Sequence, residues 1–178
     1  MAGIPFEDNR VSHQEFQSLK ASLPFEHVPV LEIDGEVVSQ SLAILRYVGS
    51  LSGLYPTVDP IRAIREDEIF ALVDELYDSP IFNASLREAV PGTTAATSVI
   101  PKSLEFLEKR VAAHGGPYAT GSTLGTADLA LYVLLSNLTS GRIKGIPTTI
   151  LEPFVNLKRV LELVGAHPKI AEWNAANQ

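Results

Sequence analysis

Two polar side chains, Gln40 and Ser41, stand where a run of strand-like residues gives way to a helical pattern. A serine hydroxyl at such a junction lies beside the unpaired backbone N–H groups and the positive dipole end of the helix, which favours binding of an anion. The same position suits an ordinary serine N-cap, a common structural role. Taken alone, the residues leave both interpretations open.

Composition narrows the chemistry that such a site can do. The sequence has no cysteine, which excludes disulfides, a thiolate zinc site and a cysteine nucleophile. The formal net charge of -7 argues against nucleic acid or an anionic membrane as the main partner. We therefore expect a small molecule or another protein as partner. The N-terminus has no signal-peptide pattern and no apolar run is long enough to span a bilayer, so we expect a cytoplasmic protein.

The elements that must position Gln40 and Ser41 form a small α/β unit. Residues 6–11 can form a strand, and residues 13–21 a short helix after Ser12 as N-cap. Two β-rich runs flank Asp34-Gly35, the strongest short hairpin signal. An apolar stripe at helical spacing then continues to Gly53 and predicts a helix.

The remainder of the chain has helical periodicity. Residues 54–60 contain two prolines and suit a linker. Amphipathic patterns predict helices over residues 61–77, 94–113, 124–138, 150–164 and 168–175. Pro101 should kink the second of these or divide it.

Four stretches carry a resemblance to a known family: residues 23–35 (LPFEHVPVLEIDG), 39–47 (SQSLAILRY), 121–129 (GSTLGTADL) and 167–173 (HPKIAEW). In this order and separation they are similar to the glutathione transferases and look closest to the sigma-like branch. The resemblance implies an α/β plus all-α fold. An incomplete thioredoxin-like N-terminal domain over residues 1–53 would be followed, after the 54–60 linker, by an all-helical C-terminal domain over residues 61–178.

The resemblance also implies residues that bind glutathione. Val28 and Pro29 would be joined by a cis bond, with the Val28 backbone pairing with the cysteinyl part; a trans proline opening an edge strand is the alternative. Gln40 and Ser41 would hold the γ-glutamyl end. Asp78 would reach across a two-fold homodimer to the γ-glutamyl amine bound by the other subunit, the alternative being a solvated carboxylate.

Three further residues would surround the glycine end of glutathione. The Lys20 ammonium could pair with the glycyl carboxylate or be merely solvated. His27, beside the expected cis bond, would be a contact. Phe16 lacks the indole N–H that relatives offer here, so recognition of this end should be weaker.

Two residues of the helical part have a structural interpretation. Asp128 lies three positions after Gly125, the spacing of the return half of a capping box. Relatives usually carry Ser or Thr at the cap, and glycine there should cost only a few tenths of a kcal/mol.

The resemblance leaves one expected part of the family fold unmatched. Relatives begin with a strand, a turn bearing a catalytic Tyr or Ser, and a helix whose last turn aligns with Met1 to Ile4. We expect roughly 20 to 25 such residues to be absent from this sequence, and we assign no catalytic residue. Without that strand, residues 6–11 lack a parallel neighbour. A strand swapped from a partner could replace it, or residues 6–11 could move to pair with the hairpin directly, but we expect them to be irregular, because a dense core tolerates such a shift poorly.

The function implied is transfer of the glutathione thiolate to an apolar electrophile lying between the two domains, with glutathione as co-substrate and no metal. Without the catalytic hydroxyl, activity should fall at least about tenfold, because fewer thiols are ionised. One alternative is a non-catalytic binding or scaffold protein. Another is a glutathione-dependent isomerase of the prostaglandin synthase type, which the sequence does not separate from conjugation.

Overall fold

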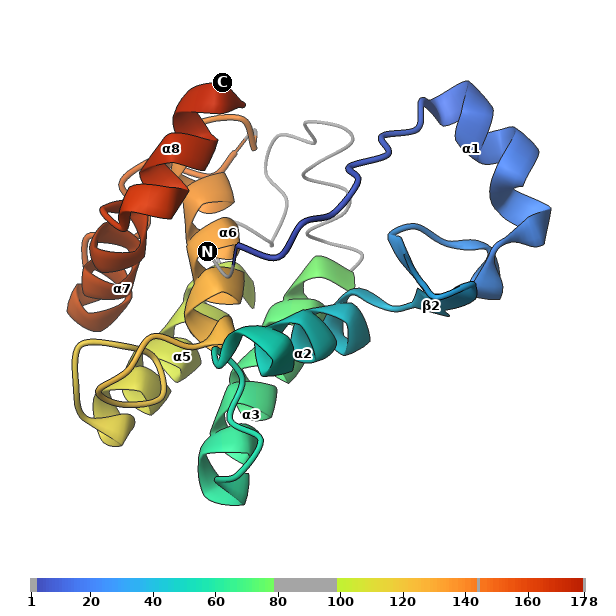
Figure 1. The fold of residues 1–178 in the computed structure, drawn as a ribbon. Helices are drawn as coiled ribbons and strands as arrows, with labels where there is room; N and C mark the ends of the chain where they lie inside the picture. The colour runs from blue at the N-terminus through green and yellow to red at the C-terminus, as the bar shows by residue number, and fades with distance from the viewer. Residues whose placement is uncertain (1–2, 79–98, 144, 178) are drawn as a thin grey trace. The chain divides into compact units, whose positions relative to one another are not determined.

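The computed structural model describes residues 3–78, 99–143 and 145–177 (Figure 1). It divides into two compact units, Met1–Tyr55 and Pro56–Gln178. The first holds a two-stranded sheet with helices and the second is helical. The predicted fold class is therefore confirmed, while the linker over residues 54–60 stays a prediction.

The first unit opens with an irregular segment and a capped helix. Residues 3–12 form no strand, so the strand that residues 6–11 were able to form is absent, and the expected irregular segment is confirmed. Helix α1 (His13–Leu19) starts at Ser12, whose hydroxyl accepts from the Glu15 N–H while the Glu15 carboxylate accepts from the Ser12 N–H. Two 3-10 turns follow, η1 (Lys20–Ser22) and η2 (Pro24–Glu26).

The predicted hairpin is also confirmed. Strands β1 (Val30–Ile33) and β2 (Glu36–Ser39) pair antiparallel, with Val30 opposite Ser39. Helix α2 (Ser41–Ser52) packs against both strands and ends at Gly53, whose φ of 71° is the left-handed conformation that glycine adopts readily. None of the hydrophobic side chains described for this unit is fully buried.

The hydrophobic core lies in the second unit. Its helices are α3 (Pro60–Asp78), α5 (Ile100–His114), α6 (Thr126–Thr139), α7 (Val155–Gly165) and α8 (Pro168–Ala176). Helix α6 packs against α3 and α7, and Figure 1 shows α6, α7 and α8 side by side. Fully buried side chains from four of these helices fill the centre, among them Phe70, Leu104, Leu131 and Leu157. No helix in the described ranges has the length and apolar character needed to cross a membrane.

One predicted helix boundary was wrong, and one predicted kink is absent from the described helix. Pro101 lies in the first turn of α5, where a missing N–H is tolerated, so α5 is not kinked there. The alternative, that Pro101 divides two helical segments, stays a prediction. The predicted residues 94–98 lie outside the described residues. The helix expected from Ile150 begins only at Val155, because Pro153 cannot donate a helical hydrogen bond and disfavours helical backbone in the residue before it.

The start of α7 is stabilised from a neighbouring helix. Its N-cap residue, Phe154, has no side chain that can accept a hydrogen bond. The Glu108 carboxylate of α5 instead accepts from the backbone N–H groups of Asn156 and Leu157, at 3.0 to 3.1 Å, and from the Asn156 side-chain amide at 2.6 Å. Glu108 therefore supplies the cap that the α7 sequence lacks.

Replacing Glu108 with alanine is expected to lower the free energy of unfolding by about 1 to 3 kcal/mol, because it removes a charged cap from partly buried donors. Glu108→Gln, which keeps one acceptor oxygen, should lose less. Urea denaturation measures both. Glu105→Ala, at an exposed position of the same helix, is the matched control and should change stability by less than about 0.5 kcal/mol. Equal losses for Glu105→Ala and Glu108→Ala would contradict the cap.

Candidate functional site

The junction between β2 and α2 has an unusual backbone. Gln40 occupies the N-cap position with φ 80° and ψ 115°, a conformation that side-chain-bearing residues rarely adopt. Such strain costs on the order of 1 to 3 kcal/mol and concentrates at functional sites. Ser41 is the first residue inside α2, so its interpretation as an ordinary N-cap is wrong.

The first turn of α2 is suited to an anion. The Gln40 side chain makes no capping hydrogen bond, and Gln40 and Ser41 are both exposed. The early N–H groups of a helix carry partial positive charge, and a hydroxyl beside them can donate to the same ligand. The junction therefore has the donors that a carboxylate requires.

The residue before this junction was missed by sequence analysis. Ser39, at the end of β2, is only 7% exposed. Its hydroxyl has no hydrogen-bond partner among the described residues. A buried hydroxyl without a partner is uncommon, which makes Ser39 a candidate for the same site. Its position in an alternating strand gives no sequence signal of this.

The predicted residues before the hairpin lie on the surface of the same unit. The Val28–Pro29 bond is cis, as predicted. Both residues are exposed, as is His27, and Val30 begins β1 directly after them. The side chains of this segment are therefore accessible to a ligand.

The first helix contributes a cation. Phe16 lies within α1 and is half-buried, and Lys20 is the C-cap residue of that helix. The Lys20 ammonium lies 3.9 Å from the carboxylate of Glu26, directly before His27. Sequence analysis missed Glu26, because a charge six residues from another inside a loop carries no pattern.

Asp78 belongs to the second unit, where it is the last residue of α3 and exposed. The ionised form of Asp74, one helical turn earlier, is disfavoured in two ways. Burial raises the pKa of Asp74, and the charge of Asp78 raises it further. Two carboxylates at the negative end of a helix dipole repel each other, so a cation there would be stabilised.

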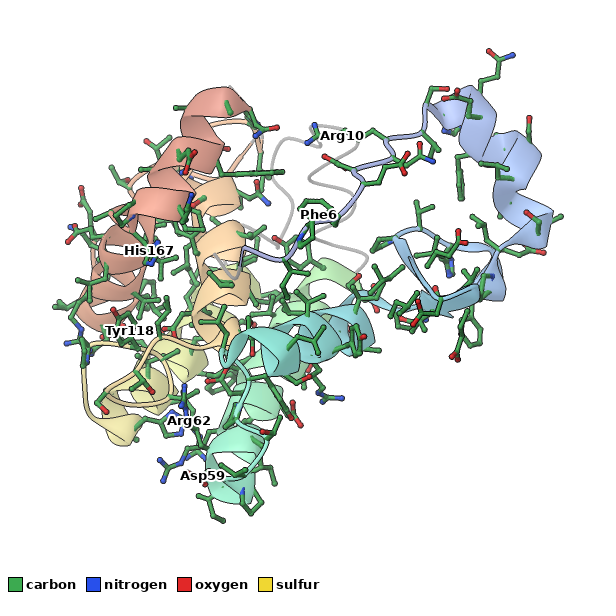
Figure 2. The ribbon with its side chains drawn as sticks, viewed as in Figure 1. Phe6, Arg10, Asp59, Arg62, Tyr118 and His167 are labelled. Atoms are coloured by element: carbon green, nitrogen blue, oxygen red, sulfur yellow. The ribbon has the colours of Figure 1, made fainter. Side chains whose placement is uncertain are left out.

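A second polar cluster is buried where α6 begins. The Asp128 carboxylate accepts from the Gly125 N–H at 2.8 Å and from the Ala119 N–H at 2.7 Å. Burial raises the pKa of Asp128 to about 6, and the Glu66 charge raises it further. Those two hydrogen bonds and Arg62 act in the opposite direction. Figure 2 shows Arg62 in the early part of α3.

Glu66 of α3 replaces the missing cap of α6. Its side chain is completely buried and accepts from the hydroxyls of Thr120 and Thr126 at 2.7 and 3.0 Å. It also accepts from the Ala127 N–H at 2.6 Å, in the first turn of α6. A Cβ at Gly125 would overlap the Glu66 carboxylate. Sequence analysis missed Glu66, although a charge on the apolar stripe of α3 was a signal.

Comparison with known proteins agrees with this architecture. The family model "Glutathione S-transferase, N-terminal domain" matches residues 1–50, and "Glutathione S-transferase, C-terminal domain" matches residues 73–177. Glutathione S-transferase 1 of Ascaris suum is 33% identical, covering 98% of this chain and 85% of that protein. The chain belongs to the glutathione S-transferase family.

Solved structures with a similar fold also include a glutathione S-transferase. The crystal structure of the glutathione S-transferase from Ascaris lumbricoides is similar with a TM-score of 0.83 and 30% identity, covering 99% of this chain and 87% of that one. The structure of prostaglandin synthase D of Nilaparvata lugens is similar with a TM-score of 0.80 and 25% identity, covering 97% and 85%. The sigma-like branch within the glutathione S-transferases stays a prediction.

Proposed function

We propose that this glutathione S-transferase binds glutathione on its first unit and adds the thiolate to apolar electrophiles. The observation that carries the proposal is the start of α2, where a strained Gln40 precedes the exposed hydroxyl of Ser41. The dipole end and free donors there suit the γ-glutamyl carboxylate. Family membership supports glutathione as the peptide that supplies it.

Other residues of the first unit would contact the cysteinyl and glycyl parts of glutathione. In this proposal the Val28 backbone, held by Pro29, pairs with the cysteinyl part. Lys20 pairs with the glycyl carboxylate, beside His27 and Phe16. The exposure of Val28 and His27 and the partial exposure of Lys20 leave all three accessible for these roles.

Replacing Ser41 with alanine is expected to raise the dissociation constant of glutathione about tenfold, because a hydrogen bond to a charged group is worth roughly 1.5 kcal/mol or more. Isothermal titration calorimetry measures it. Ser50→Ala is the matched control, since that hydroxyl of the same helix donates to the Tyr47 carbonyl. Equal affinity for the Ser41→Ala and Ser50→Ala variants would refute the site.

Turnover is a separate measurement. We assign no residue of this chain as the donor to the glutathione sulfur, so the proposal expects slow conjugation supported by the few per cent of thiol that is ionised at pH 7. An assay with an activated aromatic electrophile, with and without glutathione, tests this. Retention on immobilised glutathione without turnover would favour the scaffold alternative.

A second candidate is glutathione-dependent isomerisation. The similarity to a solved prostaglandin synthase D favours it, over nearly the whole chain. Product analysis after incubation with a prostaglandin precursor and glutathione separates the two activities, because isomerisation regenerates glutathione while conjugation consumes it.

We also propose a cytoplasmic two-fold homodimer in which Asp78 reaches the γ-glutamyl amine bound by the other subunit. The repulsion between Asp74 and Asp78 supports this, since an ammonium group there would relieve it. Light scattering at micromolar concentration measures the assembly, and a monomeric mass would refute the shared site.

A further inference from the structure

The cation that the proposed function gives to the glycine end of glutathione already has an anionic neighbour. The Lys20 ammonium lies 3.9 Å from a Glu26 carboxylate oxygen. The Lys20 side chain is 43% exposed and that of Glu26 is 64% exposed, so both charges are open to solvent and to a ligand. A ligand carboxylate that approaches Lys20 therefore meets Glu26 as well.

The backbone that carries Glu26 is held in a costly conformation. Phe25 and Glu26 are consecutive non-glycine residues in the left-handed region, with φ of 55° and 54°. This region is unfavourable by roughly 1 to 2 kcal/mol for each L-residue. Phe25 is 71% exposed, so burial of its ring does not explain the loop. Such strain is more frequent beside ligands than elsewhere.

We propose that Glu26 is a specificity-determining residue that competes with the glycyl carboxylate of glutathione for Lys20. This inference rests on the proposed function. A peptide with a free glycine carboxylate must displace Glu26 from Lys20 and remain near a like charge. A peptide whose glycine end is esterified or amidated has no carboxylate there, so it neither competes with Glu26 for Lys20 nor is repelled by Glu26. The site therefore discriminates less between the two ligands than an unopposed lysine would.

The expected effect is moderate because both groups are exposed. Exposed charge pairs are generally worth less than about 1 kcal/mol, which corresponds to a factor of up to about five in affinity. Salt should reduce the effect, since about 1 M salt shortens the screening length to roughly 3 Å. The effect of Glu26 on affinity should thus depend on the charge of the ligand and on the ionic strength. A purely structural role of Glu26 would produce neither dependence.

The test compares glutathione with its glycine monoethyl ester by calorimetry. Glu26→Gln is expected to bind glutathione about two- to fivefold more tightly than the unmodified chain and to bind the ester unchanged. The gain should shrink in 1 M NaCl. Glu36→Gln, at the opposite end of the hairpin, removes one negative charge as a matched control and should change neither affinity. In a Lys20→Met background, Glu26→Gln should lose the larger part of its effect.

The outcomes separate the two proposals. If the unmodified chain binds neither peptide, the proposed function fails, and the role of Glu26 with it. If glutathione binds but Glu26→Gln leaves its affinity unchanged, or improves both peptides equally, only the competition is refuted. Weaker binding of glutathione by Glu26→Gln would show that Glu26 positions Lys20 for the ligand, which also refutes it.

Discussion

Replacing Glu66 with alanine is expected to lower the free energy of unfolding by about 3 to 5 kcal/mol, one of the largest single effects in this chain. The carboxylate is fully buried and accepts from Thr120, Thr126 and the Ala127 N–H. Its removal leaves these buried donors without an acceptor and opens a cavity. Glu66→Gln keeps one acceptor oxygen and nearly the same volume, so it should lose roughly 1 to 2 kcal/mol. Denaturant titration measures all variants.

The adjoining glycine gives a sharper test of the same contact. Gly125 has φ -134° and ψ -178°, an extended conformation open to any residue, so the backbone does not require glycine. A side chain is excluded because its Cβ would overlap Glu66. Gly125→Ser alone should therefore destabilise the fold by about 1 to 3 kcal/mol.

The effect of Gly125→Ser should change sign when Glu66 is alanine. Without the Glu66 carboxylate, the space beside position 125 is open to a side chain. The new serine hydroxyl can then accept a hydrogen bond from an N–H in the first turn of α6, which should raise the free energy of unfolding by about 1 kcal/mol. A double-mutant cycle measures this coupling. If Gly125→Ser is destabilising to the same degree in both backgrounds, Glu66 does not replace the cap.

Local signals were sufficient for much of the first unit. Asp34-Gly35 predicted the hairpin, and the helical stripe ending at Gly53 predicted α2, because each depends on residues within a few positions. Ser12 was identified as the N-cap of α1 for the same reason. The start of α7 was misplaced by five residues where apolar spacing outweighed Pro153.

Contacts between distant residues could not be predicted in this way. Glu66 and Glu108 cap α6 and α7 from positions 61 and 49 residues earlier in the chain. Gly125 was expected to weaken the α6 cap slightly, whereas its missing side chain makes room for Glu66. Glu26 was likewise identified only by its distance to Lys20 in the structure. Ser39 was identified only because its buried hydroxyl has no hydrogen-bond partner among the described residues. Sequence spacing gives no measure of these distances.

Stability should depend on pH through Asp128. Its pKa is raised to about 6, chiefly by burial, whereas in the unfolded chain an aspartate titrates near 3.9. A carboxyl group with a raised folded pKa contributes stability that is fully present below the unfolded pKa and lost as the pH rises through the folded pKa. Between pH 4 and pH 7, ionisation of this buried group should therefore remove about 2 to 3 kcal/mol of folding free energy.

Other groups titrate over the same range, so the effect is isolated by a difference. Asp128→Asn cannot ionise, and the free energy of unfolding of the unmodified chain minus that of this variant should fall by the stated amount from pH 4 to pH 7. The like charge of Glu66 contributes to the raised pKa of Asp128, so the midpoint should move to lower pH when Glu66 is glutamine. A difference that rises with pH would mean that the hydrogen bonds from Ala119 and Gly125 to the ionised carboxylate outweigh its burial, and the assigned direction would be wrong.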